Sequence, residues 1–157
     1  IDCKANLDEL NEYEADFVTL FHVLEHVPSQ LNFLKSILKI MASGGSLVIE
    51  VPHARDMLLD GRNLKSYKNF IFWNEHLVLH TQESLEAILM LAGFKIKETQ
   101  YKQRYGFPNH LEWFMNGQPG GHIKNANMSG SEFDNSYRSW IVSNKNTDTI
   151  VVIAEKP

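Results

Sequence analysis

Short apolar runs alternate along the chain with segments whose apolar residues follow a helical period. Residues 16–21 are almost wholly apolar, which is typical of a strand buried on both faces of a parallel sheet. Residues 30–41 place apolar side chains at helical spacing after Ser29, a candidate N-cap. We expect the Ser-Gly-Gly turn at 43–45 to end this helix and residues 46–51 to form a second buried strand. The order strand, helix, strand predicts a right-handed βαβ unit of an α/β fold.

The second half of the chain repeats these patterns around a long irregular stretch. Residues 81–93 predict a helix that is capped by Thr81 and ended by a glycine. Residues 94–101 alternate as a strand, and residues 149–154 predict the last strand. The connection between them, residues 102–148, is rich in Gly, Asn, Trp and Tyr. A connection of this length is usually functional or disordered, and its aromatic side chains favour function.

Composition indicates a globular protein and argues against several classes of function. The 157 residues, 43% of them hydrophobic, suffice for one domain with a real core. The net charge of −4 is modest and the basic residues are scattered, which argues against nucleic acid as a partner. No apolar stretch is long enough to cross a membrane, and no signal segment opens the chain. The single cysteine, Cys3, cannot form an internal disulfide, which favours the cytoplasm.

Two stretches resemble class I S-adenosylmethionine-dependent methyltransferases. The run ADFVTLFHVLEHVPSQLNFLKSILKIMASGGSLVIEVP, residues 15–52, is similar to that family's fourth strand, the following helix and the fifth strand. HLVLHTQESLEAILMLAGFKIKE, residues 76–98, is similar to its later helix and sixth strand. The resemblance covers about residues 1–101 and again 149–155. It implies a doubly wound, Rossmann-like α/β sheet and S-adenosyl-L-methionine as the cofactor.

The family's glycine-rich cofactor loop, and the acidic residue after its second strand, have no counterpart in this sequence. Such a loop lets backbone amides approach the ligand, and the acidic group pairs with ribose hydroxyls. The Gly-Gly pairs at 44–45 and 120–121 lie elsewhere in the fold. The chain also opens on Ile1, so we expect an N-terminally truncated fold that binds cofactor weakly by itself. The predicted organisation is one partial methyltransferase-like domain over 1–157, with 102–148 as an insertion or acceptor-side arm.

The resemblance also implies contacts to the cofactor at two places. Asn6 and Leu7 match the family's turn after its third strand, which contacts the adenine edge. Phe21 and His22 match the end of the fourth strand, where the methionine end of the cofactor meets the methyl acceptor. Open α/β sheets bind ligands at the carboxyl ends of their strands, so the predicted fold points to the same place.

Residues 22–28, HVLEHVP, allow several kinds of chemistry. The spacing H-x-x-E-H is that of zinc peptidases, but Pro28 and the preceding buried strand leave no room for their long helix. Some class I methyltransferases carry E-x-x-E-H here and bind a divalent ion, which implies His22, Glu25 and His26 as metal ligands. A His-Glu-His set would favour Mn, Fe or Zn over Mg.

Two metal-free interpretations of the same stretch stay open. In the first, His22, Glu25 and His26 are catalytic, with one histidine as the general base on the acceptor, because imidazole titrates near neutral pH. In the second, Glu25 and His26 only cap or brace the turn above apolar neighbours.

Residues 103–122, QRYGFPNHLEWFMNGQPGGH, combine hydrogen-bonding groups with flat aromatic side chains. Pockets for sugars and nucleotides use this combination. The stretch also resembles uncharacterised methyltransferases that are encoded with surface-polysaccharide genes. We therefore predict a small hydroxylated acceptor, such as a sugar or a nucleotide-sugar, and a place in polysaccharide biosynthesis. The predicted acceptor contacts are His76, Arg104, Asn109, His110 and Trp113.

Taken together, these patterns favour an S-adenosylmethionine-dependent methyltransferase with neither nucleic acid nor membrane as a partner. The first alternative is a non-catalytic module whose aromatic arm, 102–148, binds a partner or forms a homodimer. A metal-dependent hydrolase is the second alternative. Sensitivity to chelators without dependence on the cofactor would distinguish it.

Overall fold

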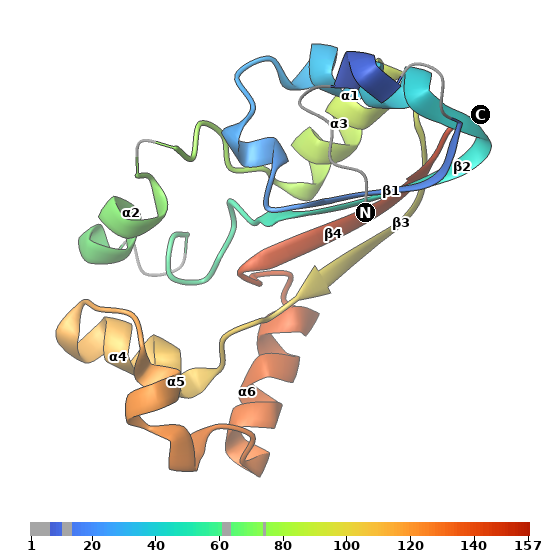
Figure 1. Cartoon of the computed structure of the whole chain (residues 1–157). Helices are drawn as coiled ribbons and strands as arrows, with labels where there is room; N and C mark the ends of the chain where they lie inside the picture. Colours follow the sequence, from blue (N-terminus) through green and yellow to red (C-terminus); the bar gives the residue numbers. More distant parts are fainter. Residues whose placement is uncertain (1–6, 11–13, 61–63, 74) are drawn as a thin grey trace.

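A computed structural model describes residues 7–10, 14–60, 64–73 and 75–157 of the chain (Figure 1). The described strands form one sheet of order β1-β2-β4-β3. β1 and β2 run parallel, whereas β4 is antiparallel to both β2 and β3. The last strand of the chain therefore lies between β2 and β3. The strands are β1 (Ala15–Phe21), β2 (Met41–Pro52), β3 (Lys95–Lys102) and β4 (Thr149–Glu155).

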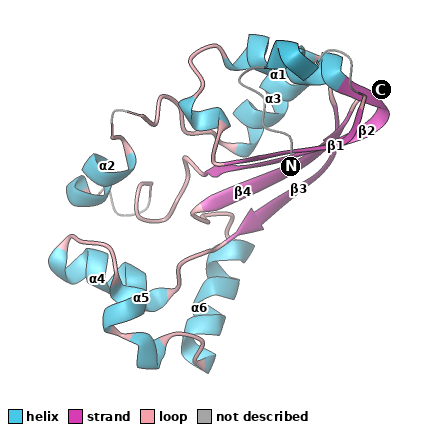
Figure 2. Cartoon of the chain, in the orientation of Figure 1, coloured by secondary structure: helices cyan, strands magenta, loops and turns pink. Residues whose placement is uncertain are grey.

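Helices α1 (Gln30–Ile40) and α3 (Gln82–Ala92) pack together on one face of the sheet (Figures 1 and 2). α3 follows the prediction closely. It begins with a capping box in which Thr81 and Ser84 bond each other's backbone N–H, and it ends at Gly93, whose φ is 105°. The two helices and the sheet bury one aliphatic cluster, including Leu34, Leu89 and Ile49.

The junction between α1 and β2 differs from the prediction. The helix ends at Ile40, and the glycines expected to stop it lie inside β2. Residues 42–45 bulge between the pair Ala15–Met41 and the pair Phe17–Ser46. A Cβ on Gly45 would stand 2.9 Å from the carbonyl oxygen of Ala15. Gly45 therefore permits a close approach of two strands, Gly44 adopts a positive φ of 78° in the bulge, and neither glycine terminates the helix.

The prediction that the first strand is buried on both faces was wrong. β1 is an edge strand in which only Leu20 is buried, while Phe17 and Phe21 are 62% and 56% exposed. Among the described residues, no strand pairs with its outer edge. An apolar run shows that a strand is suited to burial, but it does not show which neighbours cover it.

Helices also form in two stretches for which no helix was predicted. Helix α2 (Lys65–Ile71) follows β2, and residues 103–148, here called the arm, connect β3 to β4. Figure 1 shows the arm beyond one end of the sheet, on the side of α2. The arm contains α4 (Phe107–Asn116), α5 (Gly121–Lys124), the short η3 (Ala126–Met128) and α6 (Glu132–Ser143).

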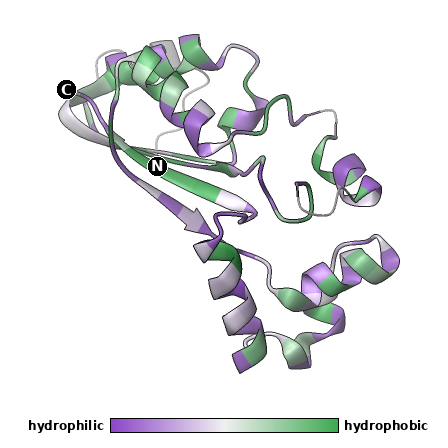
Figure 3. Ribbon diagram, turned by 180° about the vertical axis from the view of Figure 1, so that it is seen from behind, coloured by the Kyte–Doolittle hydropathy of each residue, from purple (hydrophilic) through white to green (hydrophobic). Residues whose placement is uncertain are grey.

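Hydrophobic residues run along the central strand β4, whereas polar residues are interspersed through the arm (Figure 3). A smaller apolar cluster, made of Leu58, Leu59, Tyr67 and Trp113, joins α2 to α4. None of the helices in the described ranges has the length and the apolar character to traverse a membrane.

Candidate functional site

His22 stands directly after β1, at the carboxyl end of the strand. Its backbone has φ 52°, one of two positive values among the described residues that are not glycine, and its N–H donates to the Glu50 carbonyl over 2.9 Å. A left-handed backbone costs energy for a residue with a side chain, and such strain concentrates at functional sites.

The His22 ring is held between three charged side chains. Its Nδ1 lies 3.2 Å from Glu25 Oε1 and its Nε2 lies 3.2 Å from Glu50 Oε1. The Arg104 guanidinium contacts the same Nε2. The hydrogen bond with Glu25 raises the pKa of His22, although burial and Arg104 oppose it. The site thus joins the end of β1 to the first residues of the arm.

Glu25, in the 3₁₀ helix η2 (Leu24–His26), is fully buried. Burial is the largest single effect and acts to raise the pKa of its carboxyl group, but the hydrogen bond from His22, a backbone hydrogen bond and the charges of His22 and His26 together leave the pKa below its usual value. His26 follows Glu25 directly and is about one third exposed, with its Nδ1 2.7 Å from the Glu75 carbonyl oxygen. Ligand atoms of Glu25, His26 and His76 lie within 4.8 Å of one another. The structure therefore groups His76, instead of the predicted His22, with Glu25 and His26.

A cavity of about 180 Å³ opens beside His22, between α2 and the arm. Arg104 and His76 line it with His22, and so do the aromatic side chains of Tyr67 and Tyr105. A smaller cavity of about 100 Å³ shares Tyr67, Phe70 and Tyr105 with the first and extends into the arm. We call the first the polar chamber, after its side chains His22, Arg104 and Asp148, although most of its lining surface is apolar; the second is the aromatic chamber. The aromatic chamber adds Asn109, Trp113, Pro119 and His122.

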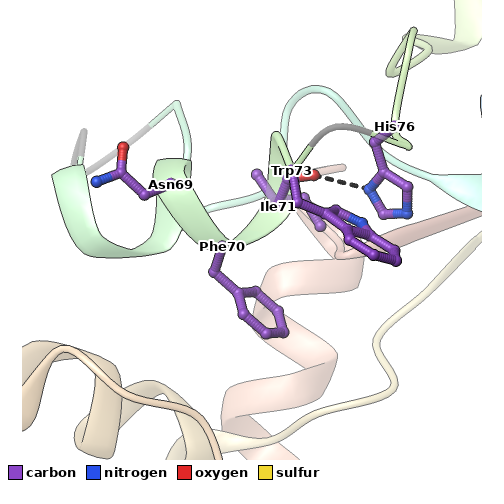
Figure 4. Close-up of a pocket in the computed structure, with 5 residues that line it drawn as sticks. All are labelled: Asn69, Phe70, Ile71, Trp73 and His76. Carbon is purple, nitrogen blue, oxygen red and sulfur yellow. Dashed lines mark hydrogen bonds between the residues drawn. The ribbon is translucent and has the colours of Figure 1, made fainter.

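A larger, mostly apolar cavity of about 530 Å³ lies along α2 (Figure 4). His76 lines it together with Phe70 and Trp73 and also lines the polar chamber. Figure 4 shows the His76 ring bonded to the Ile71 carbonyl through one nitrogen, with the other nitrogen on the far side. Size alone does not mark this cavity as the reactive one, because the charged groups converge on the polar chamber.

Tyr67 lines both chambers, and its position is fixed by two contacts. Its hydroxyl donates to the buried Asp56 carboxylate over 2.5 Å, and its ring meets Trp113 edge-on at 4.9 Å between centroids. Burial raises the pKa of Asp56 to about 6. Sequence reasoning missed both residues, because nothing in the linear order of Asp56 and Tyr67 marks a pair.

Asp148 fixes Arg104 at the mouth of the polar chamber. Its carboxylate accepts hydrogen bonds of 3.0–3.1 Å from the backbone N–H groups of Arg104 and Tyr105, and burial raises the pKa of this carboxyl. Its own N–H donates to Gln103 Oε1 over 3.0 Å. The first and last residues of the arm are thereby joined. An acidic residue just before the last strand was the only sequence signal for this role.

The other predicted acceptor contacts, Asn109, His110 and Trp113, do not all line a chamber. Trp113 and Asn109 line the aromatic chamber, where the Asn109 side chain also accepts from the Gly120 N–H over 3.2 Å. His110 is 1% exposed and lines neither chamber. Its Nδ1 lies 2.8 Å from the Tyr137 hydroxyl, and burial lowers its pKa to about 4. The position of His110 favours a packing role within the arm.

The predicted cofactor contacts are only partly described. Asn6 lies outside the described residues, and Leu7 opens the 3₁₀ helix η1 (Leu7–Leu10). Phe21, exposed at the end of β1, offers an apolar face beside His22. Glu50, which sequence reasoning did not single out, reaches the same place from β2. A charged residue near the end of an otherwise apolar strand was the signal for it.

Solved structures with a similar fold share low sequence identity with this chain. A SAM-dependent methyltransferase from Archaeoglobus fulgidus is 20% identical, with a TM-score of 0.56 over 99% of this chain and 66% of that one. A SAM-dependent methyltransferase from Thermotoga maritima, described as a possible histamine N-methyltransferase, is 17% identical, with a TM-score of 0.54 over 92% and 58%. An O-methyltransferase family protein from Burkholderia thailandensis is 12% identical, with a TM-score of 0.52 over 99% and 35%.

The chain thus spans 35–66% of the length of these structures, and at such identities the likeness shows the fold alone. No curated protein matches. The model of a family described as a methyltransferase domain matches residues 3–99, which is well over half of the chain. The chain therefore belongs to this methyltransferase domain family and has the Rossmann-like α/β fold of S-adenosylmethionine-dependent methyltransferases.

Proposed function

We propose that the chain is the acceptor-side part of an S-adenosylmethionine-dependent methyltransferase that methylates a hydroxyl group of a small acceptor, such as a sugar or a nucleotide-sugar. One observation carries the proposal. The strained His22 at the carboxyl end of β1 opens on a chamber that continues into an aromatic one. Ligands of open α/β sheets bind at this end of the strands.

Phe21 and His22 are the described residues that would meet the cofactor. The exposed ring of Phe21 supplies apolar surface for its methionine end, and His22 stands on the side of the acceptor. When bound, the cofactor supplies a methyl group on an activated sulfonium. The protein's part is to align the acceptor and to remove a proton from it.

His22 is the proposed proton acceptor. Its Nδ1 is engaged by Glu25, which fixes the ring, and its Nε2 faces the chamber, where an acceptor hydroxyl would replace the present contacts of Nε2 with Glu50 and Arg104. In the transfer, the acceptor oxygen forms a bond to the methyl carbon and the carbon–sulfur bond breaks. The hydroxyl proton passes to His22 Nε2, and the sulfur keeps the bonding electron pair. General-base assistance of this kind is worth on the order of 10²–10⁴ in rate.

The aromatic chamber supports a hydroxylated acceptor with a flat or ring-shaped body. Tyr67, Phe70 and Trp113 provide ring faces, and Asn109 and His122 provide hydrogen-bonding groups. A few placed polar groups among aromatic walls are typical of sites for small molecules. A place in polysaccharide biosynthesis remains part of this proposal.

A non-catalytic binding module is the second candidate. The arm exposes large apolar side chains, among them Ile123 at 73%, Met115 at 72% and Trp140 at 54%. Exposed apolar surface of this kind is common at protein interfaces, including homodimers. Such a module would bind its partner whether or not the cofactor is present.

The test is transfer of an isotope-labelled methyl group from S-adenosylmethionine to a panel of sugars and nucleotide-sugars by the protein that carries this chain. We expect His22→Gln to lower the transfer rate by on the order of 100-fold or more. S-adenosylhomocysteine binding, measured by calorimetry, should weaken far less than the transfer rate in the same variant, because Phe21 keeps its apolar surface for the methionine end. Equal rates in the wild type and His22→Gln would contradict the role of His22, and absence of cofactor binding in both would favour the second candidate.

A further inference from the structure

Glu25, His26 and His76 converge from two separate segments of the chain. Glu25 and His26 belong to η2, and His76 belongs to the loop after α2. The imidazole rings of His26 and His76 have centroids 4.8 Å apart, and the ligand atoms of all three residues lie within 4.8 Å of one another. Small side-chain rotations would bring these atoms around one ion.

In both histidines Nδ1 bonds a backbone carbonyl, and no hydrogen bond to Nε2 is found among the described residues; Nε2 of His26 lies 3.9 Å from Glu25 Oε1. The Nδ1 of His26 donates to the Glu75 carbonyl oxygen, and the Nδ1 of His76 donates to the Ile71 carbonyl oxygen, each over 2.7 Å. The Nε2 atom of each ring is then unprotonated in the neutral imidazole. Histidines that bind metals commonly donate their other nitrogen to a carbonyl or carboxylate in this way, which fixes the tautomer. Figure 4 shows this arrangement for His76.

Glu25 supplies an independent sign of a missing ligand. Its side chain is fully buried, and Oε1 is engaged with His22. Oε2 has no hydrogen-bond partner among the described residues. A buried oxygen without a partner is costly, and buried charges in proteins are usually paired or bind a metal.

We propose that Glu25, His26 and His76 bind a divalent transition-metal ion at the edge of the polar chamber. Two imidazoles and one carboxylate suit zinc, manganese or iron, whereas magnesium prefers oxygen ligands. Three protein ligands leave positions open, as in catalytic metal sites. The ligand set differs from the predicted His22, Glu25 and His26, because His22 bonds Glu25 and belongs to its outer shell.

The proposed metal site depends only on this geometry, whereas a role for the bound ion in the reaction depends on the proposed function. His76 lines the chamber that also contains His22. An ion held there would lower the pKa of an acceptor hydroxyl that reached one of its open positions. His22 would then receive a proton that is already more acidic.

Calorimetric titration of Zn²⁺ and Mn²⁺ into the metal-stripped protein tests the site. We expect one ion per chain in the wild type. In Glu25→Gln and His76→Gln the affinity should fall by more than the roughly 10–100-fold that loss of an outer-shell partner costs. Two matched controls, His22→Gln and the exposed His122→Gln, should still bind one ion. A rise in melting temperature with Zn²⁺ in the wild type, absent from His76→Gln, would show that the variant is folded and empty.

Absence of ion binding in the wild type would overturn the proposal, and so would loss of binding in His22→Gln with retention in His76→Gln. The role in catalysis is tested separately by methyl transfer before and after chelation. Loss of transfer that Mn²⁺ or Zn²⁺ restores would support the role. Unchanged transfer by a protein that binds the ion would keep the site and overturn the role. Failure of methyl transfer in every condition would count against the proposed function and leave the titration result standing.

Discussion

The sheet and the arm are stabilised by different kinds of interaction. Under the sheet, α1 and α3 bury a large cluster of apolar residues, with the hydrogen-bonded pair Gln30 and His80 as buried polar side chains at the start of the two helices. In the arm, the buried apolar side chains among the described residues are Pro108, Trp113 and Ile141, and Asn109, His110 and Asp134 are buried beside them. Apolar packing is non-directional, whereas a buried polar group needs partners in a defined geometry. The arm is therefore the part of the molecule whose shape depends on individual hydrogen bonds.

Asp134 shows how the arm is fixed. Its carboxylate accepts from the Phe107 N–H over 2.7 Å, from the Gly130 N–H over 3.0 Å and from Arg138 Nε over 3.2 Å. These bonds tie the start of α4 and the turn before α6 to α6 itself. Gly106 leaves room for the carboxylate, since a Cβ there would lie 1.9 Å from Asp134 Oδ1.

Removing that carboxylate should have the largest effect. Asp134→Ala leaves three partly buried donors without their charged acceptor, and we expect it to cost about 3–5 kcal/mol, confined to the arm. Hydrogen exchange would show faster exchange over the arm with the sheet still protected. Asp134→Asn keeps one acceptor oxygen and should lose less. An equal loss of hydrogen-exchange protection in the sheet would show that the sheet and the arm unfold together.

The matching change under the sheet is Leu89→Ala. Leu89 is fully buried in the aliphatic cluster, so its truncation should cost about 2–5 kcal/mol through lost transfer energy and a cavity. Here we expect the whole molecule to lose stability in urea denaturation, with faster exchange in the sheet. Loss of hydrogen-exchange protection in the arm alone would contradict the proposed difference between the sheet and the arm.

Two buried titratable groups should give opposite dependences of stability on pH. Burial raises the pKa of Asp56 from 3.8 to about 6, so the folded state holds the extra proton in that range and stability falls as pH rises. Burial, with Arg138 nearby, lowers the pKa of His110 from 6.5 to about 4, so stability rises with pH over this range. Each shift is worth about 3 kcal/mol at most, and the two nearly cancel.

Single variants separate the two effects. Asp56→Asn removes the contribution of Asp56 and keeps that of His110, so stability between about pH 4 and 6.5 should rise more steeply with pH than in the wild type. In His110→Gln the stability should change with the opposite sign relative to the wild type, rising less steeply or falling over the same range. Urea denaturation at several pH values measures both slopes. Identical slopes in both variants would show that neither group is buried as described.

The smallest expected effect is at the start of α3. Thr81→Ala removes the hydroxyl that accepts from the Ser84 N–H and should destabilise the helix by about 1 kcal/mol. Thr81→Ser keeps the hydroxyl and should be nearly neutral. Thermal unfolding distinguishes them, and an equal loss in both would mean that the methyl group of Thr81, not the cap, is responsible.

The same contrast explains what the sequence could predict. The bounds of α3, β3 and β4 follow from periodicity, a capping pair and a terminal glycine, all of which are local signals. The helices of the arm escaped prediction because their buried faces carry Asn109, His110 and Glu112, which read as surface or site residues. Hydrogen bonds between distant residues, not hydrophobic periodicity, make those positions internal.

The candidate site divides in the same way. The place of His22 follows from the fold, because the ends of parallel strands meet at one edge. The contact of Arg104 with His22 and the grouping of His76 with Glu25 depend on where loops return in space. Tyr67 and Asp56 likewise meet through the packing of α2. Such pairings have no local pattern that sequence reasoning could use.

The central claim is that the end of the rigid sheet receives the cofactor and the hydrogen-bonded arm receives the acceptor. Hydrogen exchange of the protein that carries this chain tests it most directly, first with S-adenosylhomocysteine and then with a methylated acceptor added. The account predicts slower exchange around residues 20–26 with the first ligand, and additional protection at 103–113 only with the second. Protection of the arm by S-adenosylhomocysteine alone, with the end of β1 unchanged, would contradict it.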